Sequence, residues 1–204
     1  MKKIKWNVYL GSHTLQIRIA EQKDMQAFFS YLSRQLAENG IDGSPVFQPM
    51  SRTESHLSEV MKSRFTHGIA TEMGEQGWRK MLLAFIDGNI VGHIDIRAHA
   101  EKHTAHRALL GMGVDAAARG KGLGNVLIES IFNWTAAYTD IEYIDLWVLS
   151  NNQVACRLYE RTGFTKCAEI SDMFRIDGKP QDYSMMSKAV VAAKVLTSAN
   201  TEEC

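Results

Sequence analysis

The chain is 204 residues long and carries 23 Lys and Arg residues against 23 Asp and Glu residues. Because these charges cancel, nothing in the overall composition favours binding to nucleic acid or to an anionic membrane surface. Hydrophobic residues make up 45% of the sequence, enough for one sizeable core. No stretch is long and apolar enough for a membrane span, and the basic start lacks the apolar run of a secretion signal. We therefore expect a cytoplasmic globular protein that binds neither membranes nor nucleic acid.

Neither the cysteines nor the histidines are spaced like the ligands of a metal site. Cys156, Cys167 and Cys204 are scattered and odd in number, so reduced thiols are the simplest interpretation. The histidines of one central stretch lack the helical spacing of a zinc site; they are His93, His99, His103 and His106. We expect no bound metal ion, and we expect Cys156 to pack in the protein rather than to act as a nucleophile.

The first part of the chain is expected to form a hairpin followed by two helices. Apolar and polar residues alternate over residues 3–19 on both sides of a Gly-Ser pair, as in a hairpin. Apolar residues at helical spacing follow from Lys23 to Glu38, where Asn39-Gly40 is a stop signal. Residues 39–51 are rich in turn formers, and a second helix is expected from about Thr53 to Arg64.

From Met81 onward the pattern changes to that of strands. Met81–Ile86 and Ile90–Arg97 flank Asp87-Gly88-Asn89, which is a strong signal for a hairpin turn. Ala105–Val114 has the pattern of a further strand. These segments predict a meander of three strands.

The last part of the chain alternates between helices and strands. Gly122–Thr139 has an apolar stripe at helical spacing that ends at Tyr138. A strand over Tyr143–Leu149 and a helix over Asn152–Thr162 follow. Two more strands flank Asp177-Gly178 and end near Ser187.

This order of elements predicts one α/β domain, with a mixed sheet and helices on both faces. The domain is expected over residues 1–188, in which residues 1–13 supply an extra N-terminal strand. Residues 189–204 are expected to form a C-terminal tail, since they carry no signal for a partner element.

The segment VDAAARGKGLGN, from Val114 to Asn125, carries the clearest chemical signal. Three glycines in five positions allow backbone N–H groups to approach a ligand, and the helix that begins there adds unpaired N–H groups and its positive dipole end. These features predict an anion site suited to a pyrophosphate, with Arg119 and Lys121 adding positive charge. The spacing G-x-G-x-G matches neither the dinucleotide fingerprint nor a Walker loop. A glycine-rich helix cap without a ligand is the alternative.

A second segment, LWVLSNNQVACRLYERTGF, is expected to run from a strand through a loop into a helix. Asn152, Ala155 and Tyr159 share one helix face, which suits a ligand groove because an amide can bond the ligand and a phenol can donate a proton. Val154 and Leu158 are expected to lie in the core. The alternative is a tyrosine that only packs on the core.

The pattern R-x-x-G-x-G from Arg119 to Gly124, followed by L-x-V-x-x-x-N-x-x-A-x-x-L-Y-x-x-x-G-F from Leu146 to Phe164, resembles the two core motifs of the GNAT acetyltransferase superfamily. The resemblance covers roughly residues 14–188, and Phe174–Gly178 is similar to the start of the closing hairpin of its protein and small-amine acetyltransferases. The resemblance implies a mostly antiparallel central sheet flanked by helices, with a splayed strand pair at the acyl-CoA site.

The resemblance also implies acetyl-CoA as co-substrate and a set of residues that bind it. The end of the strand before the glycine loop would meet the pantetheine and thioester, the loop would bind the pyrophosphate, and Asn152 would contact the pantetheine arm. The implied residues are Met112, Gly113, Val114, Arg119, Gly120, Lys121, Gly122, Leu123, Gly124, Asn125, Asn152 and Ala155. Tyr159 would protonate the departing CoA thiolate.

The implied reaction is the transfer of an acetyl group to a primary amine of a small molecule, a protein or a peptide, by direct attack in a ternary complex. Many family members place the general base as a carboxylate on the strand before the loop, but Ala108 and Leu110 occupy those positions here. We name His106 as the candidate base, and His93, Asp95 and a water molecule remain alternatives.

Three further questions stay open at the level of sequence. Residues 39–52 are a candidate lid or specificity loop at the acceptor, with Phe47 as a lining residue and Asp42, which lies outside the residues that the structure describes, as a group to attract a cationic amine. The rival functions are a non-catalytic module that binds acyl-CoA and an acetyltransferase for aminoacyl-tRNA or a ribosomal protein. A homodimer is compatible with the sequence, which gives neither the acceptor nor the range of acyl groups.

Overall fold

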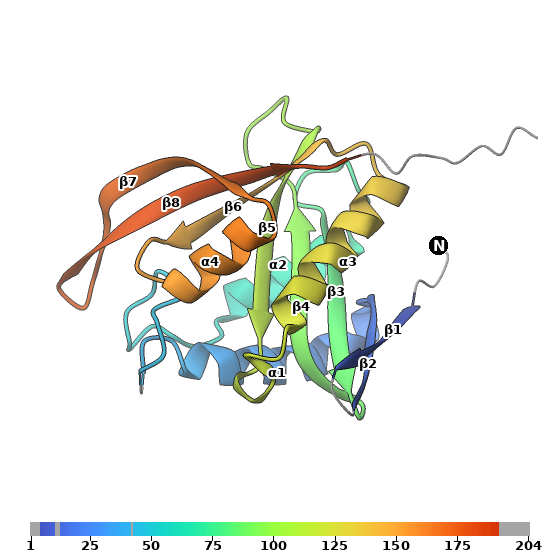
Figure 1. Ribbon diagram of the computed structural model, residues 1–204, viewed down its shortest axis with the longest axis horizontal. Helices are drawn as coiled ribbons and strands as arrows, with labels where there is room; N and C mark the ends of the chain where they lie inside the picture. The colour runs from blue at the N-terminus through green and yellow to red at the C-terminus, as the bar shows by residue number, and fades with distance from the viewer. Residues whose placement is uncertain (1–4, 11–12, 42, 192–204) are drawn as a thin grey trace, which may run out of the picture.

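A single mixed sheet runs through the part of the chain that the computed structural model describes, which is residues 5–10, 13–41 and 43–191. Its eight strands follow the order β1-β2-β3-β4-β5-β6-β8-β7 (Figure 1). Every neighbouring pair is antiparallel except β5 and β6, which are parallel. This arrangement confirms the expected α/β fold with a mostly antiparallel sheet.

The N-terminal hairpin is confirmed where the structure describes it. β1 (Lys5–Leu10) and β2 (His13–Ile19) pair in antiparallel register. Residues 1–4 and 11–12 of the expected hairpin lie outside the described residues, as do residues 192–204 of the expected C-terminal tail.

The two helices that follow are α1 (Met25–Ala37) and α2 (Glu59–Ala70). The first matches the sequence, but the prediction of a second helix from Thr53 to Arg64 is wrong by about six residues at each end. The helix begins later because the hydroxyl of Ser58 accepts a hydrogen bond from the N–H of Met61 at 3.2 Å and so caps the first turn.

The predicted meander consists of β3 (Arg79–Ile86), β4 (Asn89–Arg97) and β5 (Arg107–Val114). Asp87 and Gly88 join the first two strands with φ angles of 49° and 79°. Two consecutive residues with positive φ match the twist of the flanking strands, as in the common two-residue hairpins. The sequence signal for this turn is therefore confirmed.

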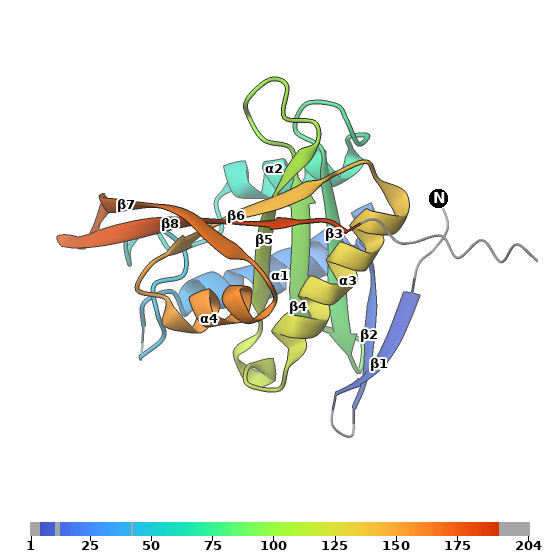
Figure 2. The same ribbon diagram turned by 45° about the horizontal axis from the view of Figure 1, so that its top comes forward.

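The C-terminal elements lie within two residues of their predicted ends. They are α3 (Leu123–Tyr138), β6 (Tyr143–Leu149), α4 (Gln153–Arg161), β7 (Thr165–Ile176) and β8 (Lys179–Ala189). β7 and β8 form a long hairpin that projects from the body of the molecule in both views (Figures 1 and 2). No helix of the described residues has the length and apolar character that crossing a membrane requires.

Helices cover both faces of the sheet and create two apolar clusters. α3 and α4 pack on one face, and α1 and α2 pack on the other (Figure 1). The apolar stripe of α3 is buried from Leu123 to Trp134, but Tyr138 is 54% exposed, so the stripe ends one turn earlier than predicted.

β5 and β6 separate soon after they begin to run side by side. Only three residue pairs join them, and the last is Leu109 with Asp145, although β5 continues to Val114 and β6 to Leu149. Beyond this point β5 stays with β4 while β6 stays with β8. The expected splayed strand pair is therefore confirmed.

A fully buried carboxylate, that of Asp145, lies at the joined end of β5 and β6, which is the end where the two strands are paired. Asp145 accepts a hydrogen bond from Nε of Arg107 at 2.8 Å and is hydrogen-bonded to Nε2 of His99 at 3.0 Å. Burial alone would raise the pKa of Asp145, but the hydrogen bonds from Arg107 and Ser187 outweigh it and lower that pKa.

Candidate active site

The glycine loop lies where β5 ends and α3 begins, and it presents a run of unused backbone donors. Within the described residues, none of the N–H groups from Gly120 to Gly124 donates a hydrogen bond. Gly120 and Gly122 have φ angles of 73° and 85°, in the left-handed region that side chains other than glycine rarely adopt. Five consecutive unused donors at the positive end of a 16-residue helix are an arrangement suited to an anion such as a diphosphate.

The last residues of β5 lead directly into this loop. Met112, Gly113 and Val114 are only half buried, because β6 has already moved away from this edge of β5. From residue 110 onward that edge has no strand partner among the described residues. An extended ligand with amide groups, such as a pantetheine arm, fits a strand edge of this kind.

The two cations predicted for the loop have different surroundings. Arg119 donates from Nε to the carbonyl of Val114 at 3.0 Å and from Nη2 to the carboxylate of Glu38 at 2.6 Å. It therefore ties the loop to β5 and to the end of α1. Lys121 is exposed and forms no ion pair with any residue in the described ranges. Lys121 is consequently the cation that remains free for a phosphate.

Gly124 allows α3 and α4 to approach each other closely. A Cβ atom at this position would lie 2.8 Å from a methyl carbon of Leu158, so a larger residue would require the Leu158 side chain to move. Asn125 accepts a hydrogen bond from Nη2 of Arg161 at 3.2 Å and links the same two helices. The prediction that Val154 lies in the core is wrong, because its side chain is 77% exposed.

Asn152 and Ala155 stand at the start of α4. The side-chain oxygen of Asn152 accepts a hydrogen bond from the N–H of Ala155 at 3.2 Å and so caps the helix. Asn152 is buried, and its side-chain NH₂ group has no partner among the described residues. Only this NH₂ group is left for the pantetheine contact expected from the sequence.

Tyr159 lies on the same helix and is buried in the apolar cluster beneath α3 and α4. Its ring meets that of Phe164 edge to face, with centroids 5.7 Å apart. Burial, with smaller effects of Cys156 and Tyr183, raises the pKa of the Tyr159 phenol well above its ordinary value. The phenol therefore keeps its proton at neutral pH, as a proton donor must.

The structure separates His106 from the other predicted site residues. His106 is exposed just before β5 begins, six residues ahead of Met112. At about 3.3 Å per strand residue, this spacing corresponds to about 20 Å. A side chain at the joined end of β5 and β6 cannot reach an amine at the open end, so His106 is not brought into the site.

His93 is the histidine that lies beside the open end. It pairs across the sheet with Gly113, and a Cβ atom on Gly113 would lie 2.8 Å from its ring. Its Nδ1 is hydrogen-bonded to the hydroxyl of Tyr31 at 3.1 Å. Burial lowers the pKa of His93 to about 4, so the imidazole is neutral at neutral pH.

Asp95, two residues further along β4, is already paired with cations. Its Oδ1 accepts a hydrogen bond from Nη1 of Arg79 at 2.9 Å and lies 3.4 Å from Nη1 of Arg97. Its side chain is almost completely buried. These pairs make Asp95 a structural carboxylate rather than a free base.

Sequence reasoning missed Gln35, which α1 places directly against the open strand. A Cβ atom on Gly113 would lie 2.1 Å from the side-chain oxygen of Gln35, so the amide rests on the glycine backbone. Gln35 is 5% exposed, and its Nε2 has no hydrogen-bond partner among the described residues. The available signal was a polar residue inside the apolar stripe that runs from Phe28 to Leu36.

The loop predicted as a lid meets the tip of the β7–β8 hairpin. The N–H of Arg52 donates to a carboxylate oxygen of Asp177 at 3.2 Å, although the two residues are far apart in the sequence. The buried side chain of Asn39 holds the loop together. Its hydrogen-bond partners are Phe47, Gln48, Met50 and Ser55.

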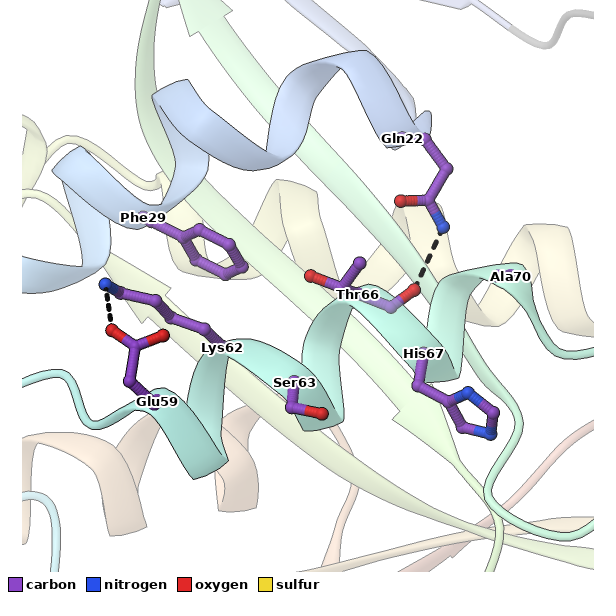
Figure 3. A pocket seen from close by; sticks show the side chains of 8 residues that line it. All are labelled: Gln22, Phe29, Glu59, Lys62, Ser63, Thr66, His67 and Ala70. Atoms are coloured by element: carbon purple, nitrogen blue, oxygen red, sulfur yellow. Dashed lines mark hydrogen bonds and ion pairs between the residues drawn. The ribbon is translucent and has the colours of Figure 1, made fainter.

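A separate hollow of about 570 Å³ lies between α1 and α2 (Figure 3). Its lining includes Phe29, the ion pair of Glu59 with Lys62, and the hydrogen bond from Gln22 to the carbonyl of Thr66. None of the predicted site residues lines it. In the described part of the chain, no group of three or more His, Cys, Asp or Glu side chains is placed to hold a metal ion.

Comparison with known proteins relates this architecture to acetyltransferases. Escherichia coli L-amino acid N-acetyltransferase AaaT is 29% identical over 85 residues, which are 42% of this chain and 52% of that protein. Human N-acetylaspartate synthetase is 34% identical over 82 residues, which are 40% of this chain and 26% of that protein. The chain thus matches about half and about a quarter of the length of these two relatives.

Solved structures share the fold over most of the chain. An acetyltransferase of the GNAT family from Streptococcus pneumoniae has a TM-score of 0.72 and 26% identity, covering 87% of this chain and 99% of that one. The yncA protein from Salmonella typhimurium, with its cofactor acetyl-CoA, has a TM-score of 0.69 and 16% identity, covering 88% of this chain and 96% of that one. The model of the Acetyltransferase (GNAT) family matches residues 51–164, which is more than half of the sequence. The chain therefore belongs to the GNAT acetyltransferase family.

Proposed function

We propose that the protein transfers the acetyl group of acetyl-CoA to the primary amine of a small molecule or peptide, within a single domain over residues 1–188. The observation that carries the proposal is the run of five unused N–H groups from Gly120 to Gly124, beside the unpaired edge of β5. The names of the curated relatives, an L-amino acid N-acetyltransferase and an N-acetylaspartate synthetase, favour an amino acid as acceptor.

The diphosphate of acetyl-CoA would accept hydrogen bonds from the glycine loop, with Lys121 nearby as a counter-charge. The pantetheine arm would lie in the gap between β5 and β6, where its amides meet the free strand edge. The side-chain NH₂ group of Asn152 is available to donate to it, and Ala155 is small enough to allow a close approach. This arrangement would place the thioester beside Met112–Val114.

The neutral amine would attack the thioester carbonyl directly and form a C–N bond. Backbone N–H groups near Met112–Val114 would stabilise the oxyanion of the tetrahedral intermediate. When the C–S bond breaks, the thiolate would take its proton from the phenol of Tyr159. No covalent enzyme intermediate is needed. Burial and the neighbouring Glu160 raise the pKa of the Cys156 thiol, which makes it a poor nucleophile.

The amine must also lose a proton, and we assign this step to His93 acting through a water molecule instead of to His106. His93 is unprotonated at neutral pH and lies across the sheet from Gly113. Its hydrogen bond with Tyr31 fixes the orientation of the ring.

Calorimetry with acetyl-CoA tests the binding step. Gly122→Ala should weaken binding at least about 10-fold, because the left-handed backbone that aims the N–H groups is lost. Gly178→Ala is the matched control, since Gly178 also has a positive φ and open space around it, but lies in the distant β7–β8 turn. Equal affinities of the two variants would contradict the proposed diphosphate site.

Release of free thiol in the presence of an amine panel tests the transfer step. Tyr159→Phe should slow release by about 100-fold without loss of acetyl-CoA affinity, since a general acid contributes 10²–10⁴-fold. Tyr138→Phe on the exposed part of α3 is the control. Initial rates should give intersecting lines when both substrates are varied, and parallel lines would indicate an acetyl-enzyme instead.

The apolar residues on β5 favour a second candidate, a module that binds acyl-CoA without transferring its acyl group. Ala108 and Leu110 are buried and provide no carboxylate for the reaction. Such a module would bind acetyl-CoA as tightly as an enzyme does. It would release no thiol with any amine, which distinguishes the two candidates.

A further inference from the structure

The face of the sheet beneath α1 and α2 contains more cationic than anionic side chains close to β5. Asp95 is paired with Arg79, and Arg97 lies 3.4 Å from the same carboxylate oxygen. Burial lowers the pKa of Arg79, and the nearby charges of Arg97 and Arg64 lower it further. The carboxylate of Asp95 therefore contacts two guanidinium groups, and a ligand with a negative charge would balance the excess positive charge of this cluster.

Arg97 is the member of this cluster that remains accessible. Its side chain is 36% exposed, and its guanidinium forms one hydrogen bond within the described residues, the long one to Asp95, whereas Arg79 is nearly buried. A Cβ atom on Gly111 would lie 2.7 Å from Oδ2 of Asp95 and 3.0 Å from Nη1 of Arg97, so both members of this ion pair lie over β5 at this glycine. Gly111 belongs to the part of β5 that β6 has left.

Gln35 lies on the same face, two residues further along the strand, against Gly113. Its Nε2 is buried and lacks an acceptor among the described residues, although an unsatisfied buried donor is costly. A free donor next to the proposed thioester position indicates that the bound ligand supplies an oxygen at this point.

We propose, building on the acetyltransferase function above, that Arg97 and Gln35 form a subsite for the carboxylate of the acceptor, and that the acceptor is a free α-amino acid. Gly111 and Gly113 are about 6.6 Å apart at 3.3 Å per residue, so Arg97 and Gln35 lie over neighbouring positions on one face of β5.

An α-amine is one carbon away from its carboxylate, so an acid bound between these donors keeps its amine beside Met112–Val114. A polyamine has no group for this subsite, and its positive charges are repelled by Arg79 and Arg97. The subsite thus selects both the class of acceptor and the amine that reacts.

The experiment measures kcat/KM for each neutral and acidic L-amino acid and for its α-carboxamide, which keeps the amine and removes the carboxylate charge. The wild-type protein should prefer the acid by about 100-fold or more, since a polar subsite strongly rejects an analogue that leaves its donors unpaired. Equal rates for acid and amide, or a better rate for spermidine, would overturn the subsite while leaving the acetyltransferase proposal intact.

Variants identify the residues responsible. Arg97→Met should lower kcat/KM for the acid by about 100-fold and for the amide by less than about 5-fold, so that the preference collapses. Lys23→Met is the control, because it removes one positive charge from an exposed site at the start of α1. A preference for the acid that survives Arg97→Met would refute the assignment.

The role of Gln35 is tested with one substitution that removes its polar group and one that adds a negative charge. Gln35→Met should lower kcat/KM for the acid by about 10-fold, and Gln35→Glu should lower it further, because the added carboxylate repels that of the substrate. A purely structural role predicts the same loss for acid and amide, and that result would remove Gln35 from the subsite.

Binding alone can test the subsite if no amine yields free thiol, a result that would reject the proposed transfer reaction. Calorimetry of amino acids with the CoA-saturated protein should then detect binding that the amides do not show and that Arg97→Met abolishes. Failure of every amino acid to bind would overturn the subsite on its own.

Discussion

The two faces of the sheet stabilise the protein in different ways. Beneath α3 and α4 the buried side chains are almost all apolar, and the strands contribute residues such as Ile94 and Leu146. The opposite face buries the smaller apolar cluster beneath α1 and α2, and the same strands also bury charged or polar residues there, among them Asp95, Asp145 and His93. The apolar face beneath α3 and α4 provides packing that does not depend on pH, whereas the opposite face adds charged groups whose contribution depends on every charge keeping its partner. The following predictions test this contrast.

Asp145→Ala should have the largest effect on stability, because it leaves Arg107 at the joined end of β5 and β6 without its partner. Removing one member of a buried ion pair costs about 3–5 kcal/mol. Since the pKa of Asp145 is lowered in the folded state, the stability it contributes is present above pH 4 and lost as pH falls. Urea unfolding should therefore show a loss at pH 7 that shrinks below pH 4, and a loss independent of pH would contradict the prediction.

Leu127→Ala on the apolar face should cost about 3 kcal/mol, because it opens a cavity under α3. This loss should be the same at pH 5 and pH 8, since no titratable group is involved. A clear pH dependence in the urea midpoint would show that the two faces do not differ as described.

His93 should make the folded state sensitive to mild acid. Its pKa of about 4 lies below the ordinary 6.5, so the unfolded chain binds a proton between these values and the folded chain does not. Stability should be complete above pH 6.5 and should fall by about 3 kcal/mol as pH drops to 4. His93→Gln should flatten this part of the profile, and a flat wild-type profile would contradict the assignment.

Gln35→Met should have the smallest effect and should stabilise the protein instead of destabilising it. We expect a gain of about 1 kcal/mol in the free energy of unfolding. The substitution removes a buried donor that has no acceptor among the described residues and replaces it with an apolar side chain of similar length. A gain in stability together with a loss of activity on amino acids would show that Gln35 is kept for the ligand. A loss of stability would mean that its amide supports the fold.

The contrast between the faces also explains which residues the sequence could predict. The glycine loop and the face of Asn152, Ala155 and Tyr159 were found because each depends on residues that are close in the chain. His93 and Gln35 meet at Gly113 from three separate elements, and no local spacing encodes that meeting. The acceptor side is therefore predicted only in part, since the sequence offers His93 as one alternative base and does not point to Gln35.

Three sequence predictions differ from the structure, and each difference has a physical cause. The sequence places the second helix too early. The pattern is compatible with a helix over a longer stretch, and the capping hydrogen bond of Ser58 sets the residue at which the helix begins. Val154 points away from the sheet because α4 buries Tyr159 on its other side. The sequence pattern places His106 on the strand that leads to the glycine loop, but it lies just before β5, at the end where β5 pairs with β6.

That short pairing has a consequence for hydrogen exchange. Three residue pairs are all that join β5 to β6, so the facing edges of the two strands lack a strand partner beyond Leu109 and Asp145 among the described residues. A pantetheine arm seated in the gap would act as a surrogate strand and bridge both edges. Amide hydrogens along the facing edges of β5 and β6 should then exchange quickly in the free protein and slowly once coenzyme A is bound.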